Sequence, residues 1–101
     1  MDKILSLCGL ARRARKVITG TDAVIDFMSK GKVNLIFVAS DASDATKDKM
    51  DKKCFFYHVN IIDKYTSLEI DQAIGTNNSK VIGIIDKGFA SEINKLLNKN
   101  N

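Results

Sequence analysis

The sequence predicts a single α/β domain, a three-layer α/β/α sandwich built on a central mixed sheet. Segments with helically spaced apolar residues alternate with short β-branched runs along the whole chain, a pattern typical of a sheet covered by helices. Two runs, VNLIFVA at 33–39 and VIGII at 81–85, are almost entirely apolar, as expected of strands buried on both faces. The chain has 101 residues, which suits one domain over 1–101 and leaves no room for two.

Each element is justified by its apolar spacing and by the residues at its ends. Ser43 or Asp44 is expected to cap the third helix, and Thr66 with Glu69 matches the capping box of the fourth. The polar residues 98–101 are expected to form a frayed tail. The expected elements are a helix over 2–14, a strand over 17–19, a helix between the Gly20-Thr21-Asp22 start signal and Gly31, a strand over 33–39, a helix over 45–57, a strand over 59–63, a helix ending at Ile74-Gly75, a loop over 77–79, a strand over 81–85, and a last helix marked by Phe89, Ile93, Leu96 and Leu97.

The positive charge is concentrated in the first third of the chain. The net charge is +4, and residues 1–32 hold seven basic and three acidic residues, whereas residues 33–101 hold nine of each. All three arginines also lie in the first segment. A localised basic face predicts a polyanionic partner.

Composition also excludes several classes of protein. The chain begins without the apolar run of a signal peptide, and no stretch approaches 18 apolar residues, so we expect no membrane partner. Two cysteines, Cys8 and Cys54, are too few for a disulfide scaffold and suit a reducing compartment. We therefore expect a cytoplasmic protein, and a monomer.

Two short motifs have both a structural and a functional interpretation. Residues 12–16 contain four bases in five residues, either a solvated helix end or a set of phosphate contacts. Gly20-Thr21-Asp22 is either an ordinary helix cap, with Asp22 as the capping carboxylate, or a nucleic-acid contact. A helix N-terminus offers free N–H groups to anions, and glycine lets a ligand approach the backbone.

No motif predicts an enzyme, a metal centre or a cofactor. Cys54 and His58 are four residues apart, but a metal site needs three or four ligands and this chain has one histidine. A packed cysteine beside a surface histidine is the better interpretation. The series Asp41, Asp44, Asp48 and Asp51 alternates with lysines, which is typical of a solvated helix face. Residues 81–85 have one glycine where a dinucleotide fingerprint needs three.

Three segments of the chain resemble a known family. They are residues 10–20 (LARRARKVITG), 38–43 (VASDAS) and 86–90 (DKGFA). In this combination and order they are similar to the bacterial YlxQ proteins of the ribosomal protein L-seven-Ae superfamily, to which the eukaryotic L-thirty-e ribosomal proteins are related. The resemblance covers about residues 3–97. It implies an L-thirty-e-like α/β/α domain that binds kink-turn RNA, a duplex bent sharply at a bulge beside tandem sheared G·A pairs.

The resemblance also implies where RNA is bound. In the family, a Gly-Thr-Asn-Glu turn at the start of the second helix reads the G·A pairs, and nearby lysine or arginine side chains contact phosphates. Here that turn has Asp22 in place of Asn, Ala23 in place of Glu, and Asp26 where a lysine is common. The loop over 76–80 is shorter than in archaeal members. The expected RNA contacts are Arg12, Arg15, Lys16, Thr19, Gly20, Thr21, Asp22, Lys30, Asp41, Ala42, Asn78 and Ser79.

The resulting prediction is a non-enzymatic protein that binds a kink-turn or related bent RNA, with association with the ribosome as a further expectation. The alternative is a protein-interaction module on the same scaffold whose RNA binding is weak or lost, since a fold alone does not fix function.

Overall fold

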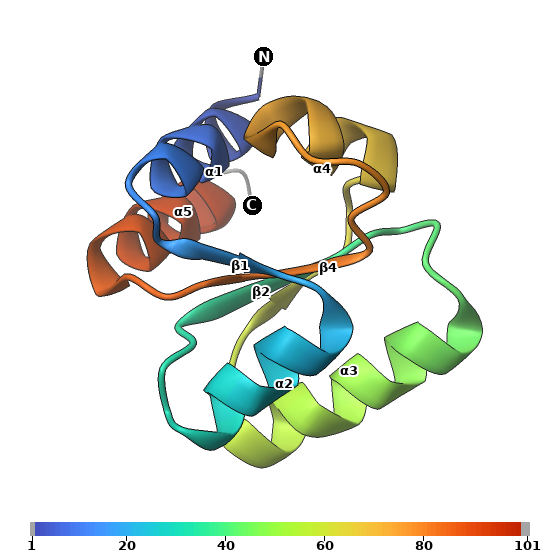
Figure 1. Cartoon of the computed structure of the whole chain (residues 1–101). Helices are drawn as coiled ribbons and strands as arrows, with labels where there is room; N and C mark the ends of the chain where they lie inside the picture. Colours follow the sequence, from blue (N-terminus) through green and yellow to red (C-terminus); the bar gives the residue numbers. More distant parts are fainter. Residues whose placement is uncertain (1, 100–101) are drawn as a thin grey trace.

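The computed structural model describes residues 2–99, which form five helices around a four-stranded sheet (Figure 1). The elements alternate along the chain as the sequence predicts. In chain order they are α1 (Lys3–Arg13), β1 (Val17–Thr19), α2 (Thr21–Ser29), β2 (Leu35–Val38), α3 (Asp44–Tyr57), β3 (Ile61–Ile62), α4 (Ser67–Ile74), β4 (Val81–Ile84) and α5 (Lys87–Lys99).

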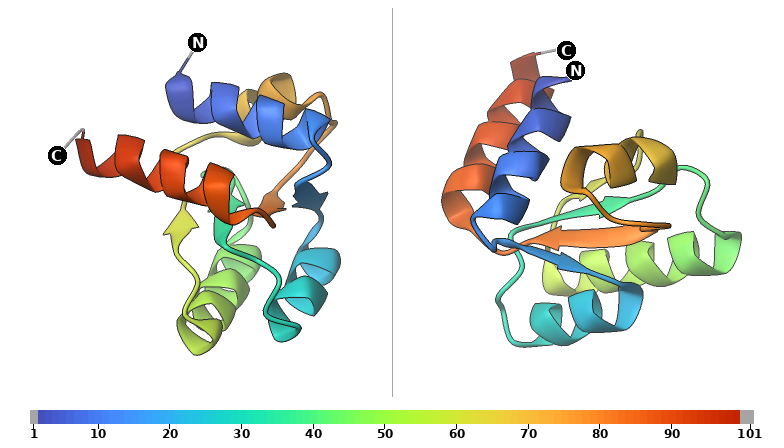
Figure 2. Two further views of the ribbon diagram at one scale, coloured as in Figure 1. Left: turned by 90° about the vertical axis from the view of Figure 1, so that its left-hand side faces the viewer. Right: turned by 45° about the horizontal axis from the view of Figure 1, so that its top comes forward.

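The sheet is mixed, with strand order β1-β4-β2-β3. Strand β4 pairs antiparallel with both β1 and β2, and β2 pairs in parallel with β3. Helices α1, α4 and α5 cover one face, and α2 and α3 cover the other (Figures 1 and 2). The predicted three-layer α/β/α sandwich with a mixed central sheet is therefore confirmed. Strand β1 lies at one edge, so the segments that precede and follow it lie at the side of the molecule.

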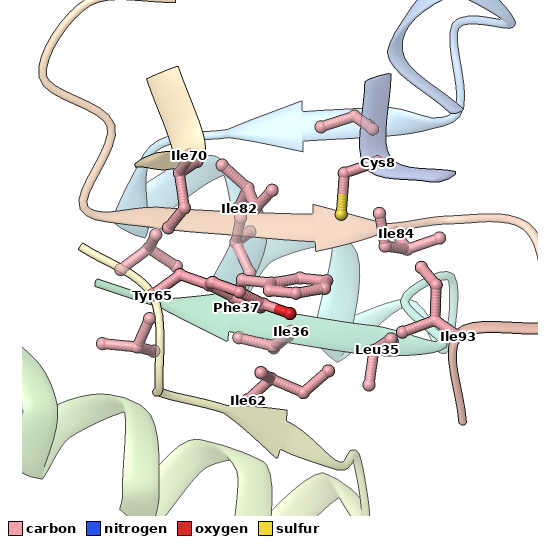
Figure 3. Close-up of a cluster of buried hydrophobic side chains, with 14 of the residues drawn as sticks. Cys8, Leu35, Ile36, Phe37, Ile62, Tyr65, Ile70, Ile82, Ile84 and Ile93 are labelled. Atoms are coloured by element: carbon pink, nitrogen blue, oxygen red, sulfur yellow. The ribbon is translucent and has the colours of Figure 1, made fainter. Parts of the chain in front are cut away.

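The core fills both sides of the central strands β2 and β4. Leu35, Phe37, Ile82 and Ile84 are fully buried beneath the three-helix layer, in the cluster shown in Figure 3. On the opposite face, a Cβ at Gly83 would lie 3.5 Å from the side chain of Val24 and 3.3 Å from that of Val33. The single glycine of this strand thus allows α2 to pack closely on the sheet.

Helix ends follow the predicted signals. Ser43 caps α3 by accepting the N–H of Thr46, and Thr66 and Glu69 form the reciprocal capping box of α4. Helix α5 continues through Asn98 and Lys99, two residues that the sequence assigns to a frayed tail. Leu96 and Leu97, which pack against the core, lie in this last stretch of α5. Asn100 and Asn101 lie outside the described residues.

Three strands are shorter than their predicted runs; β4, for example, ends at Ile84, one residue before the run at 81–85 does. Val33 and Ala39 are buried but flank β2 without belonging to it, and only Ile61 and Ile62 of the run at 59–63 form β3. Apolar runs report burial, and burial extends beyond the residues that pair within the sheet. Helix α1 is likewise one residue shorter at each end than predicted, because Asp2 caps it through its carboxylate and Ala14 begins the turn that ends it.

Candidate nucleic-acid interface

The turn between β1 and α2 is held in a backbone conformation that favours glycine. Gly20 has φ +98° and ψ 140°. Its N–H donates to the carbonyl of Val81 (2.9 Å), and its carbonyl accepts the N–H of Val24 (3.0 Å). A Cβ on Gly20 would have no neighbouring atom within 4 Å. The glycine is therefore required by the backbone angle and not by crowding inside the protein, and the space in front of it is open.

The N–H groups in the first turn of α2 lack a side-chain cap from the described part of the chain. Gly20 is the N-cap of α2, and among residues 2–99 no side chain accepts a capping hydrogen bond from this helix end. The first N–H groups of the helix therefore keep their capacity to bind an acceptor. The interpretation of Asp22 as the capping carboxylate is wrong, because Asp22 is the second residue of the helix. Its side chain is 99% exposed, with Oδ1 3.9 Å from Nζ of Lys49. Asp22 is thus open to solvent in the first turn of α2.

The loop between α4 and β4 is organised by a carboxylate that sequence reasoning missed. Asp71 accepts the N–H of Ser79 (2.9 Å) and the hydroxyl of Thr76 (2.8 Å) on one oxygen, and the N–H of Asn78 (2.7 Å) on the other. Desolvation acts to raise the pKa of Asp71, but these hydrogen bonds outweigh it and hold the pKa below its usual value. Asn78 has φ +58° and an exposed side chain.

A signal for this carboxylate was present in the sequence. Residues 76–79 (TNNS) are four consecutive small polar residues, and their N–H groups need acceptors once the loop is ordered. Asp71 is the acid closest before them in the chain. Asp71 precedes these residues by five to eight positions, which exceeds the short spacings that identify caps and turns, so those spacings do not predict its role.

The two turns meet in one hollow of about 300 Å³. They come together because β1 and β4 pair antiparallel, with Thr19 opposite Ile82. The hollow therefore joins five residues that sequence analysis assigned to RNA contact. It is lined by Thr19, Gly20, Thr21, Asn77, Asn78, Ser79, Lys80 and Val81.

Three further predicted contacts, Arg12, Arg15 and Lys16, lie at the opposite end of β1. The N–H of Lys16 bonds the carbonyl of Ala11 (2.8 Å), and the N–H of Arg15 bonds that of Arg12 (3.0 Å), which is the Schellman pattern of helix ends. Arg15 has φ +62°, at the position where such turns usually carry glycine. All three basic side chains are exposed. Strand β1, about 10 Å long, lies between them and Gly20.

Asp41 and Ala42 do not line the hollow, but Asp41 contacts Lys80, which does. The carboxylate of Asp41 accepts the N–H (2.7 Å) and hydroxyl (2.6 Å) of Ser67 and pairs with Nζ of Lys80 (3.0 Å). The hydroxyl and N–H of Ser67 and the Lys80 ammonium hold the pKa of Asp41 well below its usual range. The interpretation of Asp41 as part of a solvated helix face is thus wrong, since it precedes α3. Ala42 is buried.

Lys30 is not brought together with the other predicted contacts. It follows the last residue of α2, at the end of the helix opposite Gly20. Its ammonium pairs with Asp26 (3.0 Å) and lies 5.8 Å from the ring centre of Phe27. The length of α2 separates Lys30 from the hollow by about 13 Å.

The cysteines are packed in the interior. Cys8 and Cys54 are buried, and burial raises the pKa of the Cys54 thiol to about 11, so it is a protonated thiol at neutral pH. His58 is exposed. Among residues 2–99, no three His, Cys, Asp or Glu side chains are grouped to hold a metal ion, and no helix is long and apolar enough to cross a membrane.

The chain is similar to known proteins over almost its whole length. Residues 2–94 match the ribosomal protein L7Ae/L30e/S12e/Gadd45 family. The RNA-binding protein YlxQ of Enterococcus faecium is 41% identical over 94% of this chain and 91% of its own. The protein of the same name from Bacillus subtilis strain 168 is 35% identical over 90% of this chain and 91% of its own.

Two solved structures share the fold. A protein of unknown function from Bacillus halodurans superposes with a TM-score of 0.93 at 36% identity, covering 97% of this chain and 99% of its own. A 15.5 kD RNA-binding protein of Giardia lamblia has a TM-score of 0.81 at 15% identity, covering 98% of this chain and 88% of its own. At that identity the second likeness concerns the fold alone.

Proposed function

Because the chain belongs to the ribosomal protein L7Ae/L30e/S12e/Gadd45 family, we propose that it binds RNA, and more narrowly a kink-turn or a related sharply bent RNA. Two relatives that match nearly its whole length are named RNA-binding proteins. The family and these names also support the sequence-based prediction that the chain is not an enzyme. Its activity is then recognition, and the candidate interface must account for it.

The observation that carries this proposal is the hollow shared by residues 19–21 and 77–81. On one side it has the open N-terminus of α2, which attracts phosphate through free N–H groups and the helix dipole. On the other side it has the exposed side chain of Asn78, which both donates and accepts hydrogen bonds. This pairing of an anion site with a hydrogen-bonding side chain suits the backbone and an accessible base edge of a bent RNA.

The basic end of α1 supplies a second point of attachment. Arg12, Arg15 and Lys16 are exposed, and Arg15 and Lys16 lie at the other end of β1 from Gly20. Arginine grips phosphate oxygens in pairs. An RNA that reaches both ends of β1 would be held at two places about 10 Å apart. We further propose that Lys30, Asp41 and Ala42 have at most a secondary part, since they lie away from the hollow or have their polar atoms engaged.

Three further proposals concern the cellular compartment, the oligomeric state and association with the ribosome. We propose that the protein acts in the cytoplasm as a monomer and associates with ribosomes through this surface. Sedimentation of cell extracts on sucrose gradients tests the association. Co-migration with ribosomal particles that is lost in an Arg15→Gln, Lys16→Gln double variant supports it, and migration only at the top of the gradient contradicts it.

Titration calorimetry with two RNAs tests the proposed function directly. One RNA is a kink-turn, and the other is the same duplex without the bulge. We expect the kink-turn to bind about tenfold or more tightly, a difference of about 1.4 kcal/mol. Equal affinity for both RNAs would reduce the protein to a general RNA binder. Absence of binding to either would favour the interaction module.

A further inference from the structure

Most charged side chains of α3 lie on a basic side or an acidic side, while Lys47 lies beside the acids. Acids and lysines alternate along the sequence, which predicts a mixed solvated face. At 3.6 residues per turn, however, the helix places most of them on two sides, which meet at an ion pair between Lys52 and Asp48 (3.0 Å). The basic stripe, with spacing i, i+3, i+4 and i+7, is Lys49, Lys52, Lys53 and Phe56; the acidic stripe is Asp44, Asp48, Asp51 and Phe55.

The basic stripe is continuous with the candidate interface. Helices α2 and α3 lie side by side on one face of the sheet (Figures 1 and 2). Nζ of Lys49 is 3.9 Å from Oδ1 of Asp22 in the first turn of α2. The stripe therefore starts beside the α2 N-terminus and extends for about 10 Å along α3, from Lys49 to Phe56. A polyanion bound at the α2 N-terminus meets the basic side of α3.

Phe56 is an aromatic side chain without a place in the core. It is 70% exposed, and its ring packs edge-on against Tyr57, with the centroids 4.9 Å apart and the planes at 89°. The neighbouring ring restricts Phe56 while most of its surface stays open. Proteins that bind single-stranded RNA stack unpaired bases on such rings and contact the phosphates with nearby lysines.

We propose that single-stranded RNA adjoining the bent element continues along this basic stripe, with an unpaired base stacked on Phe56 and phosphates held by Lys49 and Lys53. This inference rests on the proposed function, because the strand must come from RNA bound at α2. The charge pattern selects the path: the acidic stripe repels RNA, so Phe55, although 84% exposed, lies on the wrong side of the helix. The two adjacent phenylalanines are thus a matched pair.

The first test compares a blunt kink-turn with the same RNA carrying a tail of about ten nucleotides, at each end in turn. The wild-type protein is expected to bind one tailed RNA more tightly than the blunt one. Phe56→Ala is expected to lose that gain, weakening binding to the tailed RNA about fivefold or more. Phe55→Ala is the control and keeps the gain. Both rings are exposed, so neither change endangers the fold.

A fluorescent reporter gives an independent reading, because the chain contains no tryptophan. A single tryptophan in the Phe56→Trp variant is expected to change in emission when the tailed RNA binds and not when the blunt RNA binds. The same residue in Phe55→Trp is expected to respond to neither. Equal responses at the two positions, or none at position 56, overturn stacking on Phe56.

The lysines are tested by salt dependence. Removing two phosphate contacts with Lys49→Gln and Lys53→Gln should flatten the log–log salt slope for the tailed RNA by about 1.4. The control removes the same charge elsewhere, with Lys47→Gln on another side of α3 and Lys95→Gln on α5. An unchanged slope in the first variant, or equal flattening in both, overturns the path along α3.

The two proposals fail in different ways. If the wild type binds the blunt kink-turn but gains nothing from either tail, the path along α3 is wrong and the proposed function stands. If the wild type binds none of the RNAs, the proposed function fails and this inference fails with it.

Discussion

The two turns that flank β1 each contain a residue with a positive φ, but the residue types differ: Arg15 precedes the strand and Gly20 follows it. Each requires a positive φ, which is +62° before the strand and +98° after it. The turn after the strand uses glycine, the residue that enters this region without strain. The turn before it uses arginine, for which a left-handed conformation costs roughly 1–2 kcal/mol. The positive φ explains why position 20 is a glycine, whereas the positive φ at position 15 disfavours the arginine found there.

Under the proposed function, this difference separates residues that shape the candidate interface from residues that bind RNA through their side chains. A strained non-glycine position persists when something else favours it. The Arg15 side chain is exposed, so packing does not explain it, and we propose that contact with RNA does. Asn78, with φ +58°, lies between the two cases, because Asp71 bonds its N–H and thereby holds its conformation.

The largest effect is expected from Gly20→Val. The φ of +98° strains any side chain, so we expect destabilisation of about 1–3 kcal/mol. The new side chain also fills the open space in front of the turn, so RNA binding should be lost. Gly31→Val is the control, since Gly31 has φ +69° and open space at the far end of α2. Urea unfolding and calorimetry should show two destabilised proteins, of which one binds RNA. Equal binding by both would contradict the role of the turn.

Asp22→Asn tests whether the turn that follows β1 contacts RNA through residue 22. The change removes a negative charge beside the RNA and adds two N–H donors. A good hydrogen-bonding pair to a base edge is worth about 1–3 kcal/mol in duplex DNA, so binding should tighten about tenfold. Stability should fall only slightly, because Gly20 and not Asp22 is the cap.

The control for Asp22→Asn is a kink-turn whose G·A pairs are replaced by Watson–Crick pairs. The gain in affinity should shrink on that RNA if the turn reads the sheared pairs. An equal gain on both RNAs would mean that only the charge matters. No gain on either would favour the protein-interaction alternative.

Arg15→Gly tests the arginine side and should move stability and binding in opposite directions. Relief of the left-handed arginine should stabilise the fold by about 1 kcal/mol. Loss of one phosphate contact should flatten the salt slope by roughly 0.7–0.9. Arg15→Ala separates the two effects, since it removes the charge but keeps the strain. A variant that is more stable and binds RNA with an unchanged slope would show that Arg15 is not a contact.

The smallest effect concerns how stability depends on pH through Asp71, which holds the loop between α4 and β4. The pKa values of Asp71 and Asp41 are lowered in the folded state, so their stabilisation is present above about pH 4, the unfolded value, and is lost as pH falls further through the folded pKa values. Asp71→Asn should be less stable than the wild type at pH 7 and lose less stability on acidification. Urea unfolding across this range measures it, and parallel pH profiles would exclude Asp71 as the source.

Local patterns in the sequence predicted most of the fold. The alternation of elements, the buried strands and the Thr66 capping box depend on neighbouring residues, and the structure confirms them. The family assignment from residues 10–20, 38–43 and 86–90 is confirmed as well. The strand ends were less accurate, because Val33 and Ala39 are buried without pairing in β2.

The site was harder to predict because its geometry depends on distant contacts. Residues 19–21 and 77–81 share a hollow only through the pairing of β1 with β4, and here the family resemblance supplied what spacing could not. Asp71 was missed because it acts across five to eight residues. The positive φ of Arg15 was missed because glycine, the usual marker of such a turn, is absent there.

The bond from the N–H of Gly20 to the carbonyl of Val81 has a consequence for synthesis on the ribosome. A nascent chain carries the basic end of α1 and the Gly20 turn from early in translation, but β4, which pairs with β1 between them, begins 61 residues after Gly20. Until residues 81–84 leave the exit tunnel, β1 lacks its neighbour and the hollow has only one wall. Competence for the proposed RNA binding is therefore expected only after β4 has emerged and paired with β1.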